Sequence, residues 1–140
     1  PDHLQAVRDG LWLVVNGAGT GVRARIAGRD VSGKTGTAQA NISLANARLF
    51  AGRRDVQDHG WFVFFAPRDN PQIAGVIFGE HALHGSWTAP IAKHVLETFF
   101  AKQDGLPLPA SPLRAAAAAA AVAQAGRPAG GTPPAGGGGR

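Results

Sequence analysis

The residues best suited to chemistry lie between positions 32 and 39, which read Ser-Gly-Lys-Thr-Gly-Thr-Ala-Gln. This stretch combines an ammonium group on Lys34 with hydroxyls on Thr35 and Thr37, and Gly36 lies between the two threonines. Ammonium and hydroxyl groups together bind carboxylate or phosphate, and glycine lets a ligand lie against the backbone. The segment predicts an anion-binding strand. On composition alone, a glycine-rich edge strand with a solvated lysine stays open as the alternative.

A second functional interpretation of the same region is a phosphate-binding P-loop. Residues Gly28–Thr35 match G-x-x-x-x-G-K-T letter for letter. A P-loop must lead into a helix whose N-terminus faces the phosphates, whereas Gly36-Thr37 is a poor helix start. The apolar runs end at Ala66-Pro67 and Gly79-Glu80, not at an Asp that could hold magnesium. Nucleotide binding at Gly28–Thr35 is therefore the remote alternative.

Histidines near the end of the second apolar run raise the question of a metal site. His81 and His84 lie next to Glu80, but no H-E-x-x-H motif is present. We expect no metal site, no other cofactor, and a loop with incidental histidines. Four other ring-bearing residues are expected to serve packing: His59, Trp61, Trp12 and Trp87.

Net charge does not point to a nucleic-acid partner, although the chain carries +5 and has a pI near 11.1. Residues 1–109 hold eleven basic and nine acidic side chains, a balance of +2, and the other three arginines lie beyond them. The absence of cysteine excludes disulfides and thiolate metal ligands. The sequence contains no transmembrane run and no signal peptide. It begins at Pro1 without any Met, so we expect an upstream part to be missing.

The first half of the chain should supply a helix and two strands around the Lys34 segment. Apolar residues at spacings of three and four predict an amphipathic helix that ends at Asn16-Gly17. Its expected buried stripe is Leu4, Val7, Leu11, Val14 and Val15. Alternating apolar and basic residues predict a half-exposed strand over 22–26. After a turn at 28–30, small and β-branched residues predict a second strand over 31–39.

The second half should supply a hairpin and a closing helix, after a long connection over 41–58. Two apolar runs, 61–65 and 73–78, flank turn residues at 67–71 and predict a hairpin. Because both runs are continuously apolar, we expect each face of the hairpin to be covered. Thr88 should cap a helix with Pro90 in its first turn. Its expected buried stripe is Ile91, Val95, Leu96, Phe99 and Phe100.

These elements predict an α+β fold, in which an antiparallel sheet is packed against N- and C-terminal helices. Residues 1–109 should form the folded part. Residues 110–140 are rich in Ala, Gly and Pro and can bury almost nothing. We expect them to be a disordered tail.

The Lys-Thr-Gly-Thr strand, with its flanks, resembles the C-terminal part of the transpeptidase domain of class B penicillin-binding proteins. The resemblance covers roughly residues 2–109 and is closest to penicillin-binding protein 2, the elongation-specific subfamily. Three flanking motifs support it: Asp58-His59 ahead of the hairpin, Phe65-Ala66-Pro67 leading to Asn70-Pro71-Gln72, and Leu106-Pro107. The implied fold is the penicillin-binding or serine β-lactamase-like transpeptidase fold.

The resemblance also implies an activity and roles for the site residues. Such enzymes attack the penultimate D-alanine carbonyl of a peptidoglycan stem peptide, release D-alanine, pass the acyl group to an amine, and bind β-lactams. Lys34 would supply positive charge, the Thr35 and Thr37 hydroxyls would bind the terminal carboxylate, and the Thr37 backbone N–H would serve the oxyanion hole. Gly36 would permit close contact.

The family uses S-x-x-K, S-x-N and K-[ST]-G-[ST] motifs, and only the third is present. None of the four serines fits either missing motif: Ser32, Ser43, Ser86 and Ser111. We expect this chain to be inactive alone and to belong to a longer enzyme of the inner membrane, facing the periplasm through a missing N-terminal anchor. The resemblance implies partners in the cell-elongation machinery with a glycosyltransferase. The alternative is a non-catalytic sensor or scaffold module.

Overall fold

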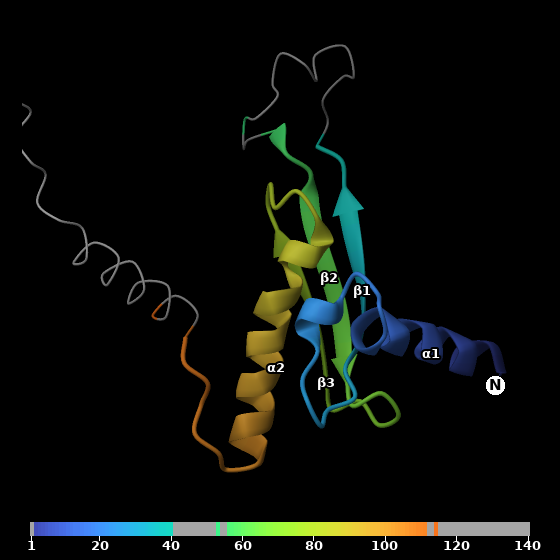
Figure 1. The fold of residues 1–140 in the computed structure, drawn as a ribbon, viewed down its shortest axis with the longest axis vertical. Helices are drawn as coiled ribbons and strands as arrows, with labels where there is room; N and C mark the ends of the chain where they lie inside the picture. The colour runs from blue at the N-terminus through green and yellow to red at the C-terminus, as the bar shows by residue number, and fades with distance from the viewer. Residues whose placement is uncertain (1, 41–52, 54–55, 112–113, 115–140) are drawn as a thin grey trace, which may run out of the picture. The chain divides into compact units, whose positions relative to one another are not determined.

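The computed structural model describes residues 2–40, 53, 56–111 and 114. The elements follow one another along the chain as α1 (Asp2–Asn16), η1 (Val22–Ala24), β1 (Ser32–Ala38), β2 (His59–Ala66), β3 (Ile73–Gly79), η3 (Gly85–Trp87) and α2 (Ala89–Gln103). Figure 1 shows the three strands side by side, with α2 along them and α1 across their direction. The predicted α+β arrangement is confirmed.

The sheet has the order β1-β2-β3, and both pairings are antiparallel. In its register Thr35 lies opposite Phe62, and Phe62 lies opposite Ile77. The predicted hairpin is therefore confirmed as β2 and β3. Its loop is closed by the Gln72 N–H, which donates to the Ala66 carbonyl at 2.9 Å. In this register β1 forms one edge of the sheet.

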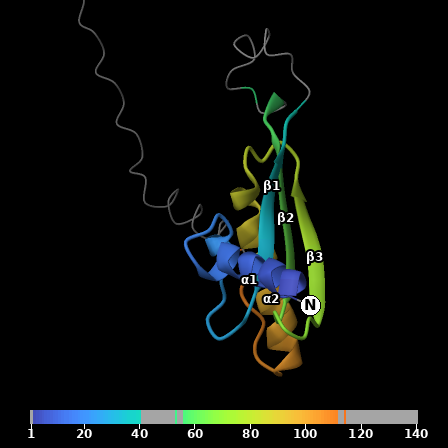
Figure 2. The same cartoon turned by 90° about the vertical axis from the view of Figure 1, so that its right-hand side faces the viewer.

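Both long helices pack on one face of the sheet. Alternation along β2 turns Phe62 and Phe64 toward that face, where both are buried. They form one apolar cluster with Val15 from α1 and with Leu96 and Phe100 from α2. This cluster is the core of the described residues, and Figure 2 shows the three strands running alongside one another from a second direction.

The opposite face of the sheet is exposed in the described residues, so the predicted cover on both faces of the hairpin is not found within them. Trp61, Val63, Val76 and Phe78 are 39%, 46%, 53% and 48% exposed. The continuous apolar runs did not separate the two faces. The structure distinguishes the two faces because α1 and α2 both pack on the face that carries Phe62 and Phe64. We refer to this surface below as the open face.

Helix α1 has the predicted bounds but not the full predicted stripe. Val15 is buried, whereas Leu4 and Val7 are 58% and 57% exposed. Figure 1 shows the N-terminal part of α1 extending away from β1. Only the C-terminal end of the helix reaches the core, which is why the first part of the stripe has nothing to pack against among the described residues.

The strand predicted over 22–26 is wrong. Residues Val22–Ala24 form a short 3-10 helix, and only an isolated bridge joins Ile26 to Arg29. The Arg25 guanidinium explains the difference, because it donates to the carbonyl groups at the end of α1: to Val15 at 3.2 Å, to Gly17 at 2.8 Å and also to Asn16. Satisfying the end of a helix in this way fixes the local path of the chain.

Helix α2 (Ala89–Gln103) begins where predicted, but two residues of its predicted buried stripe are exposed. Ile91 and Val95 are 52% and 39% exposed, while Leu96 and Phe100 are buried. The other buried positions are Ala89, Ala92 and Ala101. Small alanines facing the core let the helix lie close to the sheet. The buried face of α2 is therefore not the face predicted from its large apolar residues alone.

Thr88 is the N-cap residue, as predicted, with Pro90 in the first turn. Its hydroxyl nevertheless donates backward to the Gly85 carbonyl at 2.7 Å and does not cap the helix. Thr88 is 1% exposed, so this bond satisfies a buried hydroxyl within η3.

Most of the predicted connection over 41–58 and of the predicted tail lies outside the described residues. The division of the chain into compact units falls between Pro109 and Ala110. The disorder of 110–140 stays a prediction. Among the described helices, none is long and apolar enough to cross a membrane.

Candidate functional site on strand β1

Strand β1 carries all four residues of the Lys-Thr-Gly-Thr motif, and these residues alternate between the two faces of the sheet. Lys34 lies opposite Val63 and Gly36 opposite Trp61, which places both on the open face. Thr35 and Thr37 alternate with them and lie on the face that the helices cover. Side chains from both faces meet only along the free edge of β1. A ligand in contact with all four residues has to lie along that edge.

Backbone groups on this edge add to the site. The Lys34 ammonium donates to the Thr35 carbonyl at 2.7 Å. In an antiparallel ladder, successive residues alternate between bonding the neighbouring strand and pointing away from it. The Thr35 carbonyl accepts from a lysine side chain, which fits a residue whose backbone groups point away from β2. Because Thr37 lies two residues further along β1, its backbone N–H and carbonyl then point away from β2 as well. The edge thus offers a cation, hydroxyls and backbone donors together.

Thr20 also contacts the motif, although no sequence pattern indicated it. Its hydroxyl lies 2.6 Å from the Thr35 hydroxyl, so the segment between α1 and η1 contacts the motif directly. The available signal was a hydroxyl residue between Gly19 and Gly21, just beyond the predicted end of the first helix. A shared hydrogen bond between two hydroxyls fixes how each one points.

The two glycines near Lys34 differ in whether the surrounding structure leaves room for a side chain. A Cβ atom at Gly33 would come within 2.7 Å of the Phe62 ring and of the Val63 carbonyl, so the core requires glycine there. A Cβ atom at Gly36 would meet only the Trp61 Cβ, at 3.5 Å, which is ordinary contact. Among the described residues, nothing excludes a side chain at Gly36.

The P-loop alternative is excluded by the geometry. Lys34 and Thr35 lie in the middle of β1, which continues to Ala38. A phosphate-binding loop needs these residues at the N-terminus of a helix. The prediction that Gly36-Thr37 does not begin a helix is therefore confirmed.

The histidines near the hairpin contact one another and their neighbours. The His59 ring lies 4.8 Å from the His81 ring and 5.5 Å from the Phe78 ring. Trp61 also packs on Phe78, with ring centroids 4.4 Å apart, so the packing roles predicted for His59 and Trp61 are confirmed. No group of three metal-ligating side chains was found within the part of the chain that the structure describes.

The other two tryptophans make polar contacts as well. The Trp12 ring nitrogen donates to the Asp30 carboxylate at 3.0 Å. Trp87 is 56% exposed, and the Arg23 guanidinium lies 4.9 Å from its ring centroid. Trp87 thus lies at the surface and packs against the Arg23 side chain.

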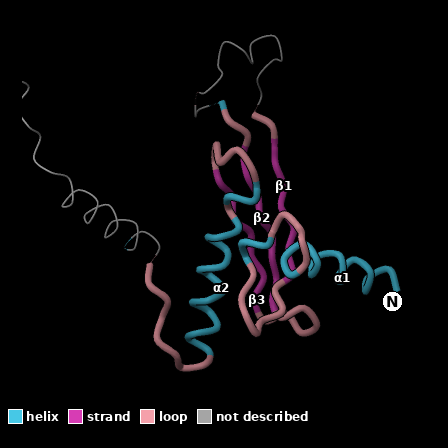
Figure 3. Tube along the Cα trace, viewed as in Figure 1, coloured by secondary structure: helices cyan, strands magenta, loops and turns pink. Residues whose placement is uncertain are grey.

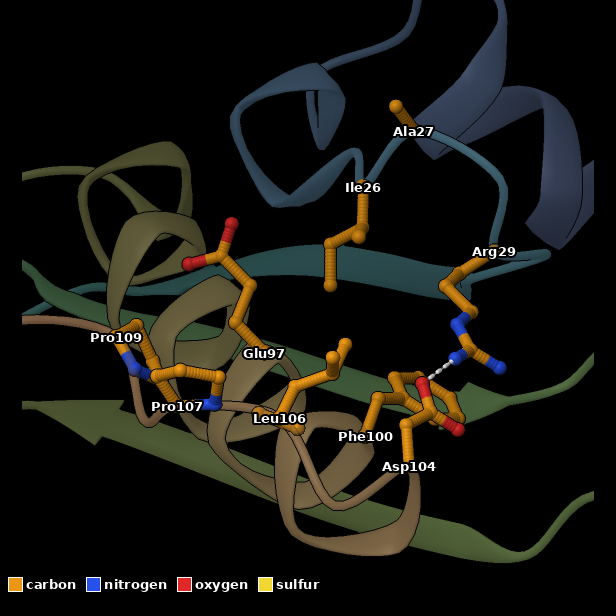
Figure 4. A pocket seen from close by; sticks show the side chains of 10 residues that line it. Ile26, Ala27, Arg29, Glu97, Phe100, Asp104, Leu106, Pro107 and Pro109 are labelled. Carbon is orange, nitrogen blue, oxygen red and sulfur yellow. Dashed lines mark hydrogen bonds and ion pairs between the residues drawn. The ribbon is translucent and has the colours of Figure 1, made fainter.

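A separate pocket lies away from the motif, at the C-terminal end of α2 (Figure 4). It has a volume of about 380 Å³ and is lined by Ile26, Phe100 and Leu106 among others. The Arg29 guanidinium at its rim pairs with the Asp104 carboxylate and lies 4.4 Å from the Phe100 ring centroid. None of the motif residues lines this pocket, so it is distinct from the β1 site.

Comparison with known proteins identifies the family. Residues 1–97 match the family model described as the penicillin-binding protein transpeptidase domain. The chain belongs to the penicillin-binding protein transpeptidase family. The predicted family resemblance is confirmed, and with it the assignment of the sheet and helices to a portion of the transpeptidase fold.

Curated relatives of this family agree. The chain is 38% identical over 100 residues to the peptidoglycan D,D-transpeptidase MrdA of Haemophilus influenzae, and 39% identical over 88 residues to that of Acinetobacter baumannii. These matches cover 68% and 61% of the chain but only 15% and 13% of the relatives. The chain therefore spans about one seventh of the length of these transpeptidases.

Solved structures show the same fold. A complex between penicillin-binding protein PBP2 and MreC from Helicobacter pylori is similar with a TM-score of 0.54 at 28% identity, over 68% of this chain and 17% of that one. A D,D-transpeptidase domain from Eggerthella lenta is similar with a TM-score of 0.53 at 36% identity, over 71% and 20%. The likeness to penicillin-binding protein 2 extends to structure.

Proposed function

We propose that this chain supplies one wall of the active site of a peptidoglycan D,D-transpeptidase, which cross-links stem peptides and is acylated by β-lactams. The proposal rests on the family membership and on one observation: the Lys-Thr-Gly-Thr motif lies on an edge strand. An edge strand can bind an extended peptide through its backbone and through side chains on both faces. A stem peptide ending in D-Ala-D-Ala suits such a site.

The motif residues take distinct roles in this proposal. Lys34 supplies positive charge at the edge, and the Thr35 and Thr37 hydroxyls bind the terminal carboxylate. The outward Thr37 N–H donates to the oxyanion that forms when the carbonyl is attacked. The space beside Gly36 admits the ligand. No step needs a metal or a cofactor.

The serine nucleophile is not among the residues of this chain, because none of its serines fits S-x-x-K. The proposed catalyst is thus a complete protein that carries this chain together with that motif. Its expected place is the inner membrane with the domain on the periplasmic side. The PBP2 structure in complex with MreC supports a proposed partner in the cell-elongation machinery, where a glycosyltransferase is also expected.

The test is acylation of the complete protein by a fluorescent penicillin, followed by gel fluorescence and stopped-flow kinetics. We expect covalent labelling of the wild type, and acylation slowed by more than about tenfold in Lys34→Ala, since a positive charge held in place within a reaction cleft contributes at least this much. Thr37→Val should slow acylation less than Lys34→Ala, because the backbone N–H is kept. Absence of labelling would instead favour a non-catalytic sensor or scaffold module.

A further inference from the structure

A cluster of hydrogen bonds ties the turn after β3 to the start of β2. The Leu83 N–H donates to the Asp58 carbonyl at 2.9 Å, and the His81 N–H donates to His59 Nδ1 at 3.1 Å. His81 Nδ1 lies 2.9 Å from the Gln57 carbonyl oxygen. We call these residues, 57–59 with 81 and 83, the histidine clasp. The transpeptidase mechanism proposed above does not use them.

These bonds fix the protonation of both rings. Since the Gln57 carbonyl can only accept, His81 Nδ1 must carry a proton. Since a backbone N–H can only donate, His59 Nδ1 must be unprotonated, which requires the neutral imidazole with its proton on Nε2. If His59 Nδ1 gained a proton, it would face the His81 backbone N–H, and neither group could accept a hydrogen bond from the other. The bond from His81 to His59 therefore exists only while His59 is neutral.

The turn held by the clasp has an unfavourable backbone. His81 and Leu83 have φ values of 52° and 67°, in the left-handed region that non-glycine residues seldom adopt. Such residues persist where the surrounding contacts hold them, and they gather at functional sites. The clasp bonds are among the contacts that hold this turn, beside backbone bonds within it such as the one from the His84 N–H to the Ala82 carbonyl at 2.7 Å.

The clasp connects to the motif by two routes. The Asp58 carboxylate accepts from the Ala40 N–H at 3.1 Å, which anchors the chain directly after β1. The turn leads into η3, where a Cβ atom at Gly85 would come within 2.8 Å of the Gly36 nitrogen and closer still to the Gly36 and Trp61 carbonyls. Figure 3 shows η3 as a short helical stretch between β3 and α2. Backbone thus packs on backbone at Gly36, next to Thr37.

We infer that Asp58, His59 and His81 are positioning residues for the transpeptidase reaction, and that neutral His59 is the form that holds the β1 edge in place. They touch no substrate. They fix the backbone at Gly36 and Thr37 through η3 and through the end of β1. The inference rests on the proposed function. It predicts that acylation weakens as His59 gains a proton at low pH.

The surroundings of His59 contain few other charges. The preceding residue in the chain is Asp58, β3 contributes the uncharged Phe78 ring, and the residue opposite on β1 is Ala38. From the turn come the His81 ring and Glu80, whose carboxylate lies 3.8 Å from His81 Nε2. The titratable His81 ring contacts His59 directly, so the variants must separate the two.

The test compares two His59 variants in the complete protein by acylation with fluorescent penicillin from about pH 8 to about pH 5, the range in which histidines usually titrate. His59→Asn places an amide oxygen where Nδ1 accepts but cannot titrate. His59→Ala removes the acceptor at every pH. His94→Asn, on α2 and outside the clasp, is the matched control. Hydrogen exchange of residues 80–85 is measured in parallel.

We expect wild type and His94→Asn to lose acylation rate together as the pH falls, and His59→Asn to lose at least threefold less over the same range. His59→Ala should be slowed by about tenfold at pH 8, because small displacements of catalytic groups are costly, and should show faster exchange over 80–85. Equal pH profiles for wild type and His59→Asn, or normal acylation of His59→Ala at pH 8, would overturn the inference. An unlabelled wild type would instead overturn the proposed function on which it rests.

Discussion

Thr20 offers a sharp test of the site, because sequence patterns did not indicate it and the structure does. Its hydroxyl lies 2.6 Å from that of Thr35. Thr20→Val keeps the side-chain shape but removes the partner, which leaves the Thr35 hydroxyl free to rotate away from a bound carboxylate. Thr20→Ser keeps the hydroxyl. The valine variant should therefore slow acylation, and the serine variant should not.

The size of the effect follows from the exposure of the bond. A neutral hydrogen bond contributes about 0.5–1.5 kcal/mol net. Because Thr20 is exposed, water can replace it in part, so the lower half of that range applies. This corresponds to a slowing of about twofold to fivefold, since about 1.4 kcal/mol changes a rate tenfold.

The assay is stopped-flow acylation of the complete protein by fluorescent penicillin. Thr98→Val is the matched control, since the Thr98 hydroxyl donates to the His94 carbonyl within α2 at 2.8 Å, away from the motif. The double variant Thr20→Val with Thr35→Val should lose little more than Thr35→Val alone, because the two hydroxyls act as one unit. Additive losses, or equal slowing in Thr98→Val, would refute the reasoning.

Two predictions concern stability, measured as the free energy of unfolding in denaturant. Leu96→Ala should lower it by about 2–5 kcal/mol, because Leu96 is fully buried in the core, whereas Ile91→Ala on the exposed side of α2 should change it by less than about 1 kcal/mol. Asp104→Ala, which breaks the half-exposed pair with Arg29, should cost less than about 1 kcal/mol and less still in high salt. A large loss in Ile91→Ala or a small one in Leu96→Ala would contradict the observed orientation of α2.

Strong local patterns predicted the elements well. The hairpin was predictable because β-branched and aromatic residues flank a turn rich in Pro, Asp and Asn. The start of α2 was predictable from Thr88 and Pro90. In each case the signal lies within a few residues of the element that it specifies, and no distant contact is needed to interpret it.

Burial was harder to predict, because it depends on distant contacts. Large apolar side chains suggested that Ile91 and Val95 face the core, but alanines do so instead. The alternation at 22–26 looked like a strand, yet Arg25 is held by carbonyls at the end of α1. In both cases a partner outside the segment decides the outcome. Periodicity within a single segment carries no information about that partner.

Glycines near the motif show the same distinction within the site. In the sequence, Gly33 and Gly36 are equivalent signals of close approach. The structure separates them, because the Phe62 ring requires Gly33 while no described residue requires Gly36. If glycine at 36 serves a contact, that contact comes from a ligand or from a part of the protein outside the described residues. The free edge of β1 next to Gly36 is therefore where a substrate would be expected, between the lysine of the open face and the threonines of the covered one.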